Sequence, residues 1–172
     1  YRMVLTFGHD TIRKFASNTS EMKRMAARDF EDVLQCAIPV FDVLLPEPHN
    51  KTVLTPIFTC AYWHALAKMH MHTDEMLALL DTVTEHLRRC LRHFQWKTCA
   101  AFDTWELKRE VKCHQCCESK SQTGSSIATP ITQGVQRTKT FNLKTYKLHA
   151  LGDYSSLIHK FGTTDSYSTE PV

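Results

Sequence analysis

The sequence lacks several features that would assign it to a common class of protein. No apolar run approaches the roughly 20 residues that cross a bilayer, so no membrane-spanning helix is predicted. The opening letters, YRMVLTF, are too few and too poorly flanked for a signal peptide. With only 5 glycines, the chain has no Gly-rich phosphate loop and no Gly-x-Ser-x-Gly motif. The sequence therefore gives no evidence of a small-molecule substrate.

The net charge is small, at +3, but it is unevenly distributed. Residues 108–147 carry eight Lys or Arg against two Glu, so this stretch is strongly basic and the rest is slightly acidic. A basic stretch is compatible with a phosphate backbone, and it is equally compatible with a solvated linker. If DNA is the partner, the candidate contacts are Lys108, Arg109, Lys112, Lys139, Lys144 and Lys147.

Seven cysteines form an odd set without a secretory signal. Cys36, Cys60 and Cys90 lie within apolar helical patterns, which favours reduced thiols in an intracellular protein. The Cys113-x-x-Cys116-Cys117 cluster invites zinc, but a structural zinc site needs four ligands and no second Cys/His pair of matching spacing follows. A redox dithiol is less favoured, because no strand precedes the motif. Exposed cysteines without a metal are the prediction.

The histidines give no metal-binding pattern either. His64 falls near an apolar helix face, where a satisfied core histidine is the expectation. His70 and His72 flank a turn and lack the His-x-x-x-His spacing of a helical metal site. No Ser/His/Asp order rises above chance, so no catalytic residue is assigned.

Three helices are predicted in residues 18–118, after an N-terminal segment of residues 1–17. Asn18 and Glu21 form a capping box for the first, whose apolar stripe includes Phe30 and whose solvated face includes Asp32. Pro39 is expected at or near its end.

A second helix is predicted over residues 51–71, with apolar residues on nearly all sides as in a buried central helix. Pro56 should delay its start or kink it. Thr73 caps the third helix, which should run antiparallel to the second and carries an apolar seam. The seam consists of Met76, Leu80, Val83, Leu87, Cys90 and Phe94.

The C-terminal half is predicted to be more polar. Residues 103–118 suggest a polar helical extension, and residues 119–139 read as a disordered Ser/Thr-rich linker. Residues 140–172 form a tail with two short helices, capped by Asn142 and Asp153 and broken at Gly152, which packs back on the bundle. The predicted fold is thus all-α: an up-and-down helical bundle with a disordered linker and a short helical tail.

Several segments resemble one family of fungal transposon proteins. They are NTSEMKRMAARDFEDVLQCAIPVFD, WHALAKMHMHTDEMLALLD, KTCAAFDTWEL, TFNLKTYKLHALGDY and FGTTDSYSTE. These segments resemble the helical region and closing segment of Plavaka-type transposases of the KDZ superfamily. The resemblance covers most of the chain apart from the linker.

The resemblance implies a transposase fragment without catalysis of its own. Active members hold two metal ions with three carboxylates, the first two on strands of an RNase H-like core and the third, a glutamate, after a helical insertion. This sequence has no alternating strand pattern for that core, and Glu170 is followed by Pro171 where relatives continue into a glutamate-containing motif. The resemblance implies an intracellular, nuclear location. No cofactor is expected for this chain, because Mg²⁺ belongs only to a complete transposase, whose missing core is a candidate partner. The alternative is a helical module that binds DNA or a partner protein, and an active metal-dependent nuclease is the least favoured hypothesis.

Overall fold

The computed structural model describes residues 1, 3–4, 15, 19, 22, 25–121 and 136–164. Within these residues the regular structure is helical and the only pairing of extended segments is an isolated bridge, so the all-α prediction is confirmed. The chain divides into a first unit, residues 1–98 with 143–172, and a second unit, residues 99–142. No described helix is long and apolar enough to cross a membrane.

Helix α1 (Ala27–Gln35) begins later than predicted. Met22, Met25 and Ala26 are not helical, and the proposed cap residues Asn18 and Glu21 lie outside the described residues. The helix starts instead where Asp29 accepts a hydrogen bond from the Ala26 backbone N–H at 2.8 Å. A carboxylate in the first turn satisfies a free donor and suits the positive end of the helix dipole.

The buried face of α1 also differs from the prediction. Phe30, expected in the core, is 60% exposed, whereas Asp32, expected in solvent, is 4% exposed. The helix breaks at Cys36 and resumes as α2 (Ala37–Phe41), so Pro39 falls in the first turn of a new helix. A proline is tolerated there because first-turn N–H groups have no intrahelical acceptor.

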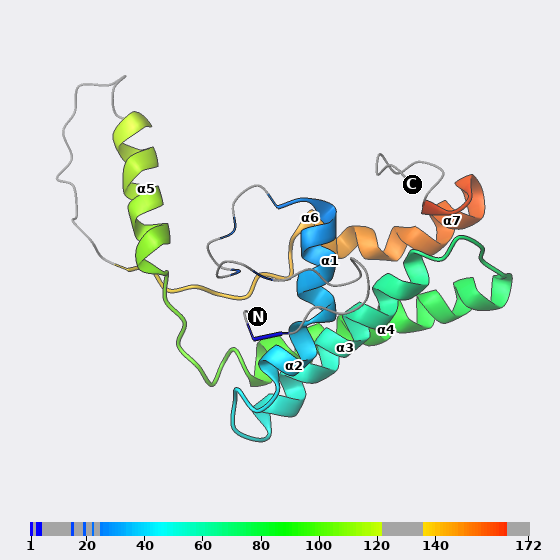
Figure 1. Cartoon of the computed structure of the whole chain (residues 1–172), viewed down its shortest axis with the longest axis horizontal. Helices are drawn as coiled ribbons and strands as arrows, with labels where there is room; N and C mark the ends of the chain where they lie inside the picture. Colours follow the sequence, from blue (N-terminus) through cyan, green and yellow to red (C-terminus); the bar gives the residue numbers. More distant parts are fainter. Residues whose placement is uncertain are drawn as a thin grey trace. The chain divides into compact units, whose positions relative to one another are not determined.

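Helices α3 (His49–Ala67) and α4 (Asp74–Lys97) form an antiparallel hairpin, seen side by side in Figure 1. His49 Nδ1 lies 3.3 Å from Thr98 Oγ1 at one end, and Trp63 Nε1 donates to Thr84 Oγ1 at 2.8 Å farther along. The predicted Thr73 cap is confirmed, since its hydroxyl oxygen accepts from the Met76 N–H at 3.3 Å. His49 at the beginning of α3 thus meets the end of α4, whereas Trp63 near the end of α3 meets an earlier residue of α4, so the predicted antiparallel arrangement is also confirmed.

Helix α3 is not surrounded by core as predicted. Phe58 is 62% exposed and Tyr62 is 41% exposed, and their rings stack on the outer face at a centroid distance of 6.4 Å. The buried face includes Thr52 and Thr59, whose hydroxyls donate to the carbonyls one turn earlier. Because those hydroxyls are satisfied within the helix, threonine can occupy positions that the hydropathy pattern gives to larger apolar residues. Pro56 lies inside α3 and does not delay its start.

The core is built from α3, α4 and the C-terminal tail. The tail comprises α6 (Tyr146–Ala150), a 3₁₀ turn η3 (Leu151–Asp153) and α7 (Tyr154–Phe161). Its return onto the helices was predicted and is confirmed by the buried cluster, which consists of Trp63, Leu66, Ala67, Leu77, Leu80, Val83, Leu87 and Ile158.

Aromatic and polar contacts fix the tail on the hairpin. The Tyr154 ring meets the Trp63 ring edge to face at 4.9 Å, and the Ser155 hydroxyl donates to Asp81 Oδ2 at 3.1 Å. The predicted caps were wrong in detail: Thr145, not Asn142, precedes α6, and the Asp153 side chain makes no cap hydrogen bond to α7.

The second unit contains α5 (Lys108–Ser121), the helical extension expected near residues 103–118. Trp105 pairs with Thr138 in an antiparallel bridge, and the Lys139 N–H donates to the Thr104 carbonyl at 2.8 Å. The predicted disorder over 119–139 is therefore wrong at both ends, because residues 119–121 are helical and residues 136–139 are paired. The pairing of residues 104–106 with 137–139 uses backbone hydrogen bonds and needs no apolar pattern, so the composition of the segment did not predict it. Residues 122–135 lie outside the described residues.

Candidate functional site

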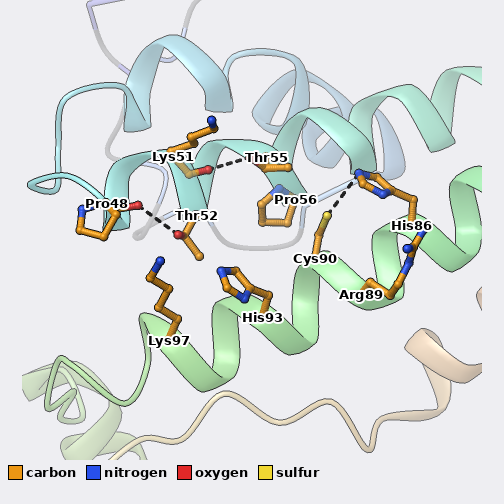
Figure 2. Close-up of a pocket in the computed structure, with 10 residues that line it drawn as sticks. All are labelled: Pro48, Lys51, Thr52, Thr55, Pro56, His86, Arg89, Cys90, His93 and Lys97. Carbon is orange, nitrogen blue, oxygen red and sulfur yellow. Dashed lines mark hydrogen bonds between the residues drawn. The ribbon is translucent and has the colours of Figure 1, made fainter.

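A cleft between α3 and α4 is a candidate site in the first unit (Figure 2). Its volume is about 360 Å³, and we call it the α3/α4 cleft. It lies toward the end of the hairpin where α3 begins and α4 ends. Its lining residues are Pro48, Lys51, Thr52, Thr55, Pro56, His86, Arg89, Cys90, His93 and Lys97.

The α4 wall of the cleft follows from helical spacing. His86, Arg89, Cys90, His93 and Lys97 recur at intervals of three and four residues, which places them on one face of the helix. Figure 2 shows these side chains directed from α4 toward α3. A single stripe of α4 thus supplies two permanent cations, two imidazoles and a thiol.

The α3 wall is largely apolar because its hydroxyls are already engaged. Thr52 Oγ1 donates to the Pro48 carbonyl at 3.0 Å, and Thr55 Oγ1 donates to the Lys51 carbonyl at 2.8 Å. Pro56 adds a ring without an N–H, and both it and Thr52 are buried. Only Lys51 adds charge from this side.

Among the residues that the structure describes, no carboxylate lines the α3/α4 cleft. Glu85 immediately precedes the lining residue His86 on α4 but does not line the cleft. Its carboxylate lies 4.0 Å from Arg88 Nη1 and 3.6 Å from Arg92 Nη2, and neither arginine lines the cleft. A positive cleft with low-dielectric walls concentrates anions, so the arrangement suits a phosphate or carboxylate ligand. Lysine offers a point charge and arginine a planar fork for such a group.

A second hollow in the first unit has the opposite character. It lies between α4 and the tail and is lined in part by Asp74, Asp81 and His159. His159 Nδ1 lies 4.0 Å from Asp74 Oδ1, and Asp81 accepts the Ser155 hydroxyl. Two carboxylates at its wall would repel a phosphate, so this hollow suits an anion less well than the α3/α4 cleft does.

The six residues predicted to contact DNA do not form a single surface within one unit. Lys108, Arg109 and Lys112 lie exposed on α5 in the second unit. Lys139 belongs to the same unit, where its Nζ lies 3.6 Å from the buried carboxylate of Glu106 and 4.0 Å from Glu110.

The remaining two predicted contacts lie in the first unit. Lys144 precedes α6 and Lys147 is within it, and both are exposed. The sequence reasoning missed the α3/α4 cleft because it compared net charge between segments. The detectable signal was local: HLRRCLRHFQWK, residues 86–97, contains no acidic residue.

The thiols differ in their surroundings. Burial raises the pKa of Cys60 and Cys99, and burial followed by the negative charge of Asp32 raises that of Cys36. Cys90 instead lines the cleft, with its Sγ 3.4 Å from His86 Nε2. No disulfide joins the six cysteines whose side chains the structure describes, and Cys113 and Cys116 are exposed on α5. The Cys117 side chain lies outside the described residues.

The histidines near the α3 end also differ from expectation. His64 is not a core residue: its Nε2 lies 3.5 Å from Glu31 Oε1, which also contacts Lys68 Nζ at 2.7 Å. His72 Nε2 lies 2.9 Å from the Leu66 carbonyl. Within the described ranges, no group of three His, Cys, Asp or Glu side chains is arranged to hold a metal, and Glu170 falls outside those ranges.

Comparison with known proteins identifies no relative: no family model, no curated protein and no solved structure matches the chain.

Proposed function

We propose that this chain is a helical nucleic-acid-binding module of a transposon-derived protein, and that the α3/α4 cleft holds backbone phosphates. One observation carries the proposal: Lys51, Arg89 and Lys97 all line a cleft whose described lining residues include no carboxylate. The sequence resemblance to fungal transposases supplies the biological context, including a nuclear location. The cationic side chains that line the cleft supply the groups that would bind phosphate.

Phosphate binding at this cleft would be independent of base sequence. Arg89 can pair two of its N–H groups with the oxygens of one phosphate, while Lys51 and Lys97 act as point charges. His86 and His93 add further donors at the same wall. Contacts of this kind position a nucleic acid but do not select among bases.

The basic surface on α5 is a competing location for the same function. Lys108, Arg109 and Lys112 are exposed and carry the same formal charge as the three cations of the cleft. Lys139 is a weaker candidate, because Glu106 and Glu110 already lie near its ammonium. The two sets therefore provide matched charge-removal variants.

The proposed module has no catalysis of its own. Two-metal phosphoryl transfer needs several carboxylates around the ions, and the sequence pattern offers Glu170 alone near the expected position. Mg²⁺ would enter only with a transposase core supplied by a separate part or partner. Incubation of the chain with plasmid DNA and Mg²⁺ or Mn²⁺ should leave the DNA intact, and nicking that is lost in Glu170→Gln would contradict this.

The binding test compares two triple variants of equal charge. Affinity for duplex DNA is measured across a salt series for the natural chain, for Lys51→Gln/Arg89→Gln/Lys97→Gln and for Lys108→Gln/Arg109→Gln/Lys112→Gln. Each phosphate contact contributes roughly 0.9 to the slope of log affinity against log salt. The cleft variant should therefore flatten the slope by about 2 to 3, while the α5 variant changes it little.

The outcomes separate the two surfaces. Loss of slope in the α5 variant alone would place binding on α5 and refute the assignment to the cleft. Absence of binding at about 50 mM salt, where weak electrostatic association is favoured, would refute nucleic-acid binding by either surface. Circular dichroism of each variant establishes that the helices are intact.

A further inference from the structure

Cys90 is a feature of the α3/α4 cleft that phosphate binding does not use. Its sulfur is partly exposed at the cleft wall and lies 3.4 Å from His86 Nε2, as the dashed line in Figure 2 shows. The two residues are four apart on α4, so the helix itself sets their approach. A thiol next to an imidazole has a proton acceptor within reach.

The other cysteines of the first unit are placed differently. Cys36 is buried and 2% exposed, and Cys60 packs against the buried cluster. Burial in apolar surroundings disfavours the thiolate, which is the reactive form of cysteine. Cys90 combines access, a proton acceptor and an open cavity, and no other cysteine of this unit has all three.

The charges of the cleft select the kind of reagent that can approach Cys90. Lys51, Arg89 and Lys97 line the same cavity, with His93 one turn along α4, and no carboxylate among the lining residues opposes them. Such a cavity raises the local concentration of anions and lowers that of cations. A small anionic electrophile is therefore favoured over a neutral or cationic one.

We propose that Cys90 is a thiol-modification site that undergoes exchange with small anionic disulfides of the glutathione type. The Cys90 proton passes to His86 Nε2, and the thiolate attacks one sulfur of the disulfide. A new S–S bond forms to Cys90 as the original S–S bond breaks, and the departing thiolate takes up a proton. The incoming disulfide is the oxidant, so the reaction needs no further redox partner.

The adduct would place carboxylates among the cations of the cleft. Modification would therefore compete with phosphate for Lys51, Arg89 and Lys97, a consequence that rests on the proposed function. The exchange reaction itself does not rest on it. The two can fail separately, because modification is read from mass and nucleic-acid binding from affinity.

The test uses two aliphatic disulfides of opposite charge on the full chain. Oxidised glutathione is a dianion and cystamine is a dication at neutral pH. Samples are quenched over time, digested and analysed by mass spectrometry, so that the rate at each cysteine is obtained separately. The ratio of the glutathione rate to the cystamine rate should be higher at Cys90 than at Cys60.

Two variants identify the groups responsible. Lys51→Gln/Arg89→Gln/Lys97→Gln should lower this ratio at Cys90 on the order of tenfold, and should leave the ratio at Cys113 unchanged. His86→Gln should slow both reagents at Cys90 several-fold without changing their ratio, because it removes the proton acceptor but no permanent charge.

Other results would overturn the proposal. The proposal is wrong if Cys90 stays unmodified while Cys113 reacts. It is also wrong if the triple variant leaves the ratio of the glutathione rate to the cystamine rate at Cys90 unchanged, or if Cys90 of His86→Gln reacts as fast as in the natural chain. The peptide containing Cys113 serves in every sample as the internal control for reagent quality. Circular dichroism before the reaction shows whether each variant retains its helices.

Discussion

The α3/α4 hairpin and the second unit are both ordered, but for different reasons. The hairpin buries a continuous cluster in which Leu80 and Leu87 are each 1% exposed. In the second unit, Trp105 and Leu107 are more than half exposed, and the pairing of residues 104–106 with 136–139 depends on backbone hydrogen bonds and Lys139 contacts. Apolar burial supplies most of the free energy that opposes chain entropy. The comparison indicates that the hairpin determines global stability and that the second unit contributes little to it.

The largest expected effect comes from a cavity in the hairpin. Leu80→Ala should lower the free energy of unfolding by about 2 to 5 kcal/mol, because it removes a fully buried side chain and leaves a void. Leu79→Ala is the matched control on the same helix, at a residue that is 40% exposed. Urea unfolding followed by circular dichroism measures both. Equal losses in the two variants would show that the assigned core face of α4 is wrong.

The buried hydrogen bond between the two helices should have the next largest effect. Thr84→Val removes the acceptor of the Trp63 indole N–H and should cost about 1 to 3 kcal/mol, since the donor stays buried without a partner. Trp63→Phe tests the other partner. In a double-mutant cycle, the combined variant should lose less than the sum of the single variants. Strict additivity would mean that the 2.8 Å contact contributes no coupling.

A smaller and more local effect is expected in the second unit. Glu106→Gln weakens the attraction to Lys139 Nζ, which lies 3.6 Å away, and should increase the hydrogen-exchange rate of the Lys139 amide several-fold. The exchange of the Leu87 amide in α4 should not change. A shift in the urea midpoint of the hairpin would show that the second unit contributes to global stability after all.

The smallest effect concerns pH. Burial raises the pKa of the Cys60 thiol, so the folded state favours its neutral form. The resulting stability is complete below the ordinary thiol value of 9.0 and is lost as the pH rises through the higher folded value. The free energy of unfolding should therefore fall more steeply between about pH 8 and about pH 10 in the natural chain than in Cys60→Ala. Identical slopes would assign the alkaline loss to other groups.

The sequence predicted the structure best where a single short-range interaction, such as a helix cap or a regular apolar spacing, determined the local arrangement. The Thr73 cap, the burial of Leu80, Val83 and Leu87 from the predicted α4 seam, and the return of the tail at Ile158 followed from spacing and capping chemistry alone. The prediction was weakest for α1, because its apolar residues could be placed on a helical stripe without revealing which face met the protein. As a result, Phe30 was expected in the core but is exposed, and Asp32 was expected in solvent but is buried.

The sequence by itself determined that the chain is helical, where α4 begins and that Leu80, Val83 and Leu87 enter the core, because these depend on interactions within a few residues. It did not identify the buried Leu77, and Met76, Cys90 and Phe94 of the predicted seam are only partly buried. Only the tertiary structure placed Lys51 of α3 in the lining of the same cleft as Arg89 and Lys97 of α4, since this depends on the antiparallel register of the two helices. The same register determined that Cys90 opens into a cationic cleft while Cys36 and Cys60 lie in or against packed side chains. Charge and reactivity depend on which elements pack together, and a sequence pattern describes each element alone.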